Sequence, residues 1–250
     1  MRFSRLAVAA VAAGLAASAV AHESIIICQA HPDDLSACLG FALKAKDRFD
    51  LHIVSYTGGE GGIRGKSHEE ARNIRREEDL AVARELGATL HWIGETDGAA
   101  FATPEADAKL KALFAELKPR AVFLHFPIDL HPDHTMSFAA MWRAWAFMPK
   151  PRCEVYFFEE GGIGQTHNFH PNQYLETTDV WSNLVRITRL WKSQNANDSL
   201  VRTKTQEALF RGSQMITPKR YAEAYETLIG VPADKSTVFQ EITRDSRDAP

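Results

Sequence analysis

Two short polar clusters carry the side chains best suited to chemistry. The first, HPDD at 31–34, directly follows an apolar run, and the second, DLHPDH, spans 129–134. Two histidines and a carboxylate with an open fourth position are typical of catalytic zinc sites. A divalent cation would also relieve the repulsion between the adjacent carboxylates of Asp33 and Asp34. One aspartate would then bind the metal, and the other would be free to accept a proton.

Each cluster also has a structural interpretation. Asp34 could cap the following helix, and HPDH at 131–134 could feed a helix in the same way, because Asp is favoured at such positions. Two clusters of this kind after two strands of one sheet are harder to explain by capping, so we favour a metal site. We expect six of the other histidines to be packed, solvated or in a loop near the pocket; they are His52, His68, His91, His125, His167 and His170.

Alternating strand-like and helix-like segments must position the two clusters. Short apolar segments predict strands at 24–30, 50–57, 89–95, 121–126 and 153–160. Helical patterns span 34–47, 68–87, 105–118 and 134–147. This alternation predicts a single α/β domain, Rossmann-like and three-layered, around a mostly parallel sheet. Ligands of such folds bind at the carboxyl ends of the strands, where both clusters should meet.

The N-terminal segment predicts export. Residues 1–21 combine two arginines, a short apolar run and a terminal Ala-Val-Ala, which is the layout of a cleaved signal peptide. An uncleaved anchor is the alternative, but the run is short for a membrane span. We therefore expect one domain over 22–250, periplasmic or secreted, without stable membrane insertion. The net charge of −3 gives no reason to expect nucleic acid as a partner.

Two further features of composition limit the chemistry. The cysteines Cys28, Cys38 and Cys153 form no Cys-x-x-Cys pair, so a thiolate metal site is not predicted, and one disulfide is left open. The glycine-rich segment TGGEGGIRG at 57–65 lacks the Lys-Ser/Thr ending of a phosphate loop, which argues against a nucleotide site. This segment is either a flexible lid or a plain turn.

Seven motifs together resemble the PIG-L/LmbE-like metal-dependent N-deacetylases, which act on substrates that contain N-acetylglucosamine. They occur in the family's order over about residues 24 to 230. They are AHPDD, T-x-G-E at 57–60, R-x-x-E with L-G (Arg75, Glu78, 86–87), Asp97-Gly98, D-x-H-P-D-H, Lys192-Ser193-Gln194 and YAEAY at 221–225.

The resemblance implies a role for each matched residue. His31, Asp34 and His134 match the metal ligands, and Asp33 matches the general base. His131 matches the histidine that stabilises the oxyanion, and Asp133 the carboxylate that orients it as a cation. Arg75 and Asp97 match positions that hold sugar hydroxyls. The implied cofactor is Zn²⁺, although Fe(II) or Co(II) also suits such a donor set.

Two residues depart from the family pattern. Leu35 stands where an acidic residue is usual, and Trp191 stands where a histidine is frequent. Neither change touches an expected ligand or the base, so we predict an active deacetylase of an N-acetyl sugar or oligosaccharide. The alternatives are an amidase for another acyl amide, a carbohydrate-binding protein without turnover, and a metal-dependent phosphoesterase. Trp92, Phe101, Trp142 and Trp181 could stack on a sugar, but core packing explains most of them.

Overall fold

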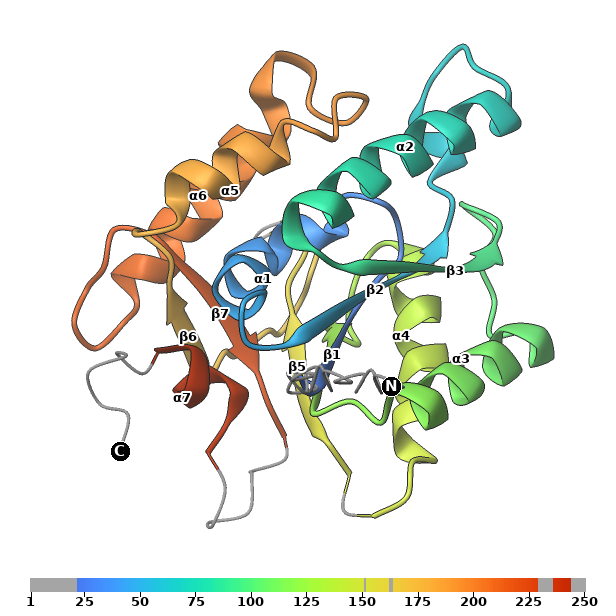
Figure 1. Ribbon diagram of the computed structural model, residues 1–250. Coiled ribbons are helices and arrows are strands. Elements are labelled where there is room, and N and C mark those ends of the chain that lie inside the picture. The colour runs from blue at the N-terminus through green and yellow to red at the C-terminus, as the bar shows by residue number, and fades with distance from the viewer. Residues whose placement is uncertain (1–21, 151, 162–163, 229–235, 244–250) are drawn as a thin grey trace, which may run out of the picture.

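A seven-stranded sheet lies at the centre of the computed structural model, which describes residues 22–150, 152–161, 164–228 and 236–243 (Figure 1). Its strands are β1 (Ser24–Gln29), β2 (Asp50–Thr57), β3 (Thr89–Glu95), β4 (Ala121–His125), β5 (Glu154–Phe158), β6 (Gln173–Glu176) and β7 (Ala222–Glu226). Their spatial order is β3-β2-β1-β4-β5-β7-β6. Strands β1 to β5 are mutually parallel, whereas β7 pairs antiparallel with β5 and β6. The predicted mostly parallel α/β sheet is confirmed.

Helices cover both faces of the sheet and complete three layers (Figure 1). One face carries α1 (Leu39–Ala45), α2 (His68–Leu86), α5 (Trp181–Thr188), α6 (Ser199–Ser213) and the short α7 (Val238–Thr243). The other face carries α3 (Pro104–Leu117) and α4 (Pro132–Ala146). Each layer buries its own apolar cluster, with Phe41 and Phe123 on the first face and Phe114 and Trp145 on the second.

Helices α2 and α3, which lie between the parallel strands in sequence, begin and end at capping residues. Helix α2 opens with a capping box between Ser67 and Glu70 and stops at Gly87, whose φ of 63° is left-handed. Helix α3 follows Thr103, whose side chain accepts the Ala106 N–H, and has proline at its first turn. These signals are local, which is why sequence patterns located these helices to within one residue of their observed bounds.

The predicted helix over 34–47 is instead two pieces, the 3-10 helix η1 (Asp34–Ala37) and α1. Asp34 does not cap a helix; its Oδ2 accepts the backbone N–H of His31 at 2.7 Å. The N-terminus of α1 is capped from a distance, because the Glu223 carboxylate on β7 accepts the N–H groups of Gly40 and Phe41. A tertiary contact therefore sets where this helix starts.

Three further expectations concern composition and targeting. Cys28, Cys38 and Cys153 are all free thiols, so the disulfide left open by the sequence does not form. Among the described helices, none has the length and apolarity that crossing a membrane requires. The expected signal peptide at 1–21 lies outside the described residues.

Candidate metal centre

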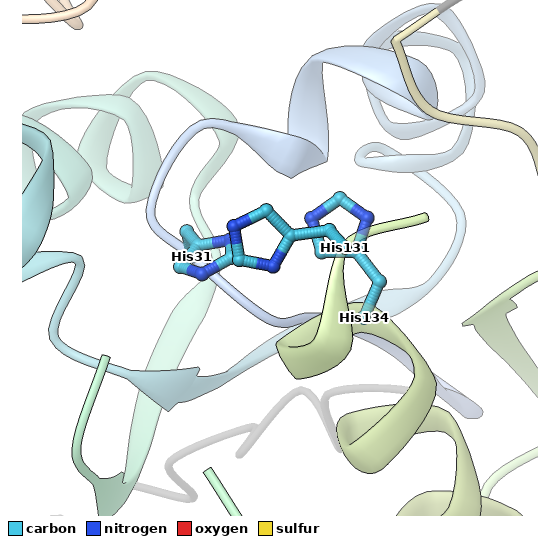
Figure 2. Close-up of side chains that lie close together, drawn as sticks. All are labelled: His31, His131 and His134. Carbon is cyan, nitrogen blue, oxygen red and sulfur yellow. The ribbon is translucent and has the colours of Figure 1, made fainter. Parts of the chain in front are cut away.

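The two polar clusters meet at the point where the strand order reverses. Strands β1 and β4 are neighbours, and the chain leaves them toward opposite sides of the sheet. HPDD follows β1 and HPDH starts α4 after β4, so both lie at the carboxyl edge. Figure 2 shows the rings of His31, His131 and His134 side by side there, with centroids 4.6 to 5.2 Å apart. The predicted convergence of these segments is observed.

A carboxylate oxygen sits among the imidazole nitrogens of this site. Asp34 Oδ2 lies 3.4 Å from His31 Nδ1, 3.6 Å from His134 Nε2 and 3.2 Å from His125 Nε2. The three predicted ligands are thus mutual neighbours through Asp34. Three overlapping groups each have ligand atoms within 4.8 Å of one another: His31-His131-His134, Asp34-His125-His134 and His31-Asp97-Asp133. Such a nitrogen and oxygen donor set suits a divalent transition metal.

Carboxylates hold the far nitrogen of each predicted histidine ligand. His31 Nε2 lies 3.2 Å from both Asp97 Oδ1 and Asp133 Oδ2. His134 Nδ1 lies 3.3 Å from Asp129 Oδ1 and 3.0 Å from the amide of Gln165. A carboxylate that accepts the proton of one ring nitrogen leaves the lone pair of the other for a metal. Assigned this way, His31 Nδ1 and His134 Nε2 both face Asp34 and fit a bound cation.

The electrostatics of the donor set agree with a cation site. Burial by itself disfavours the charged form of His31, but Asp34 and the hydrogen bonds to Asp133 and Asp97 raise its pKa well above the ordinary value. Burial likewise opposes ionisation of Asp34, yet His134 and His31 hold its pKa well below the usual range. The site is therefore built to keep Asp34 as a carboxylate next to positive charge.

Asp33, the predicted base, pairs with Arg75. Arg75 Nη2 donates to Asp33 Oδ1 at 2.5 Å, and the Arg75 side chain is only 3% exposed. Burial raises the pKa of Asp33, and the Arg75 charge opposes this shift. The Nε and Nη1 atoms of Arg75 have no hydrogen-bond partner among the described residues. Arg75 thus stands beside the base as well as beside the cleft in which it was expected to hold a sugar.

The structure places Asp133 against a different histidine from the expected one. Its carboxylate contacts His31 and accepts the N–H groups of Gly98 and Ala100. His131 Nδ1 instead accepts the backbone N–H of Asp133 at 3.3 Å. Burial and the charges of His31 and His134 lower the pKa of His131. The charges of Asp133 and Asp34 oppose this shift, and the role of His131 as an oxyanion donor stays a prediction.

Asp97 joins the site to the glycine-rich segment. Its Oδ1 faces His31, and its Oδ2 accepts the N–H of Gly61 at 2.7 Å. Gln194 Nε2 donates to the carbonyl of Gly62 from the other side. The segment expected to be either a lid or a turn is therefore held at the edge of the site by two side chains. Asp97 faces the cleft as expected, but it also orients a predicted metal ligand.

Sequence patterns missed some residues of the site. His125, expected to be merely packed, is buried but reaches Asp34, and burial together with His134 lowers its pKa to about 4. Asp129 was part of a recognised motif without a role, and it contacts His134. The ion pair between Glu160 and Lys204 carried no sequence signal, since these residues are far apart in the chain.

All the predicted site residues except Asp133 line one open cleft of ≈ 460 Å³. They share its surface with Glu160, Gly161, Gln165, Gln194, Leu200, Thr203 and Lys204 and with three glycines of the loops after β2 and β3. No Phe, Tyr or Trp among the described residues lines it, so Trp92, Phe101, Trp142 and Trp181 lie outside its lining. His52 and His91 do not line this cleft; His52 Nδ1 lies 3.1 Å from His91 Nε2.

These features define a Rossmann-like α/β protein with a candidate His/Asp metal centre. The profile of the family described as GlcNAc-PI de-N-acetylase matches residues 26–145, which include both clusters. This segment, just under half of the chain, is similar to the PIG-L (LmbE-like) deacetylase family.

The proteins similar to this chain include a hydratase and two deacetylases. A 4-oxalmesaconate hydratase of Pseudomonas putida is 24% identical over 77% of this chain and 81% of its own length. The N,N'-diacetylchitobiose deacetylase of Pyrococcus horikoshii superposes with a TM-score of 0.71 at 21% identity, covering 82% of this chain and 84% of that one. The A40926 pseudoaglycone deacetylase superposes with a TM-score of 0.66 at 16% identity, covering 81% and 95%. These structural similarities establish the fold.

Proposed function

We propose that the protein is a metal-dependent N-deacetylase of an N-acetylated amino sugar or oligosaccharide. The observation that carries the proposal is the arrangement around Asp34, where His31 and His134 face one carboxylate oxygen while Asp33 stays outside that group. The mature protein would be exported, as the N-terminal segment predicts.

The donor set fits a divalent ion held by His31, Asp34 and His134. Such an ion, zinc by preference, polarises an acyl carbonyl and lowers the pKa of an attacking water when it is bound. Iron(II) or cobalt(II) would suit the same donors.

The chain's own residues account for the rest of the chemistry. Asp33 accepts a proton from the attacking water as its oxygen bonds to the acyl carbon, and it returns that proton to the nitrogen as the C–N bond breaks. Acetate and a free amine leave. His131 Nε2–H donates to the oxygen that becomes negative. One such donor typically lowers the activation barrier by about 3 kcal/mol. Arg75 keeps the carboxylate of Asp33 in place.

Acetate release over a panel of N-acetylated mono- and oligosaccharides tests this proposal. We expect release that chelation abolishes and that added Zn²⁺ restores. Asp33→Asn should lower kcat by roughly 10²–10⁴-fold while the metal content stays at that of the unaltered protein. Metal content measured on the same samples separates loss of the base from loss of the ion.

A hydratase is the second candidate, because the curated relative from Pseudomonas putida has that name. If no sugar amide releases acetate although the protein binds one metal ion, 4-oxalmesaconate should be tested as a substrate. Its consumption with an unchanged carbon skeleton would replace the deacetylase proposal. The absence of both reactions would favour another acyl amide or binding without turnover.

A further inference from the structure

The cleft has two walls of different origin. One wall comes from the loops after β1, β2 and β3 and from α2, and it contains Asp33, Arg75 and Asp97. The opposite wall comes from the loop after β5 and from α6, where Leu200, Thr203 and Lys204 are spaced along one helical face. The predicted metal ligands lie between these walls. The proposed reaction assigns work to the first wall only.

The second wall holds a buried group of three charges. Lys204 Nζ lies 2.5 Å from Glu160 Oε2 and 3.0 Å from Glu207 Oε2, and the Lys204 side chain is 6% exposed. One ammonium group thus lies between two carboxyl groups. Burial raises the pKa of Glu160 well above its ordinary value, the Lys204 charge opposes this shift, and Asp34 and Glu207 add to it. Nothing in the proposed chemistry uses this group.

Only one of the two carboxylates reaches the cleft. Glu160 lines it, whereas Glu207 lines a separate small pocket behind Lys204. Glu160 Oε2 is occupied by Lys204, and Oε1 has no hydrogen-bond partner in the described ranges. The backbone N–H of Glu160 donates to Thr166 Oγ1, whose hydroxyl donates to Asp129 Oδ2. Glu160 is therefore anchored to the residue that orients His134, at a fixed place beside the metal centre.

We infer that Glu160 is a substrate-binding residue that accepts a hydrogen bond from a hydroxyl or ammonium group through Oε1. Lys204 fixes the other oxygen and so orients the carboxylate. This inference rests on the proposed function and specifies its substrate class, a hydroxylated neutral or cationic sugar.

Glu207 offers a matched control because it has the same partner on the other side. Glu160→Gln and Glu207→Gln each leave Lys204 with one carboxylate, so both should lower the melting temperature by similar amounts. Only Glu160→Gln replaces the charged acceptor in the cleft. Hydrogen bonds to charged groups are about twice as strong as neutral ones, and an amide at this position keeps only the weaker form.

The experiment compares these variants in the zinc-loaded full chain with N,N'-diacetylchitobiose as substrate. We expect Glu160→Gln to raise KM about tenfold with kcat within about threefold, because a binding contact is lost equally in the ground and transition states. Glu207→Gln should change both constants by less than about twofold. The affinity for glucosamine, measured by titration calorimetry, should fall in Glu160→Gln alone.

The outcomes separate this inference from the proposed function. Equal effects of both variants on KM and on glucosamine affinity would overturn the inference, since Glu160 would then only neutralise Lys204. If the unaltered protein releases no acetate from any sugar, the proposed function fails. The glucosamine titration then decides by itself: selective loss in Glu160→Gln supports the inference, and equal or absent binding in all three proteins overturns it.

Discussion

The two walls of the cleft each bury one cation, against one carboxyl group in the first wall and against two in the second. Arg75 meets one carboxylate, Asp33, and keeps two nitrogens unpaired, whereas Lys204 meets both Glu160 and Glu207. The first wall therefore keeps unpaired donor nitrogens beside its carboxylate, and the second has one more carboxyl group than it has cations. The Arg75 charge opposes the burial that raises the pKa of Asp33. The additional carboxyl group of the second wall leaves an acceptor for a ligand, so one wall is arranged for proton transfer and the other for binding.

Substitution of the two cations should test this division between the walls with the largest effects. Arg75→Met takes away the charge that opposes the raised pKa of Asp33, and we expect kcat to fall by roughly 10²-fold. Lys204→Met leaves two carboxylates buried together, and we expect a loss of about 3–5 kcal/mol in the free energy of unfolding. Steady-state kinetics and urea denaturation of both variants measure the two effects. A larger loss of kcat in Lys204→Met, at a temperature where both are folded, would contradict this division.

The partner of His134 should affect the metal more than either wall does. Asp129→Asn removes the carboxylate beside His134 Nδ1, and the loss of such a partner typically lowers metal affinity by about 10–100-fold. Thr166→Val is the control, because the Thr166 hydroxyl bonds to Oδ2 of Asp129 and to the Glu160 backbone but not to Oδ1, the oxygen beside His134. Zinc affinity by competition with a chromophoric chelator gives the comparison. Equal affinities in the two variants would show that Asp129 does not orient the ligand.

Two glycines allow a test of whether the position of Arg75 in the first wall affects the reaction. Gly59 and Gly65 both have positive φ, so an alanine at either costs about 1–2 kcal/mol in backbone strain. A Cβ on Gly59 would also lie 2.5 Å from Arg75 Nε, whereas one on Gly65 meets open space. We expect Gly59→Ala to lower kcat about tenfold by shifting Arg75 from Asp33, and Gly65→Ala to leave kcat unchanged. If the two variants had similar kcat values, the position of Arg75 would not matter for the reaction.

The smallest effect concerns Glu223, which caps α1 behind the second wall. Burial raises the pKa of Glu223 from 4.5 to about 7. Between these pH values the folded protein holds a proton that the unfolded chain has released, so stability falls as pH rises through this window and is level above it. Glu223→Gln should lack this slope. Urea denaturation between pH 5 and 8 tests the sign, and a stability difference that does not decrease with pH would contradict the shift.

The parallel half of the fold could be predicted because its signals are local. Apolar runs such as 24–30 and 121–126 end at polar clusters, and α2 is bracketed by a capping box and a left-handed glycine. The last third gave no comparable pattern. Strands β6 and β7 are short and antiparallel, and each depends on its neighbour for hydrogen bonds, which periodicity does not reveal.

Within the site, residue types were predictable and their partners were not. The histidines and aspartates of the two clusters were expected to converge, because parallel strands share one carboxyl edge. The contact between Asp133 and His31 was not predicted; the N–H groups of Gly98 and Ala100 hold the Asp133 carboxylate there. His125 was dismissed because a lone histidine in an apolar strand carries no distinguishing signal.

The sequence by itself determined the α/β alternation, the two clusters that face each other at the switch point, and the family motifs that carry the proposed reaction. The tertiary structure alone decided which charges meet. Arg75 reaches Asp33 across 42 positions of the chain, and Lys204 reaches Glu160 across 44. Pairings of this kind depend on how helices α2 and α6 pack around the sheet. That packing is set by buried area and shape summed over the whole chain, and no short stretch of sequence contains it.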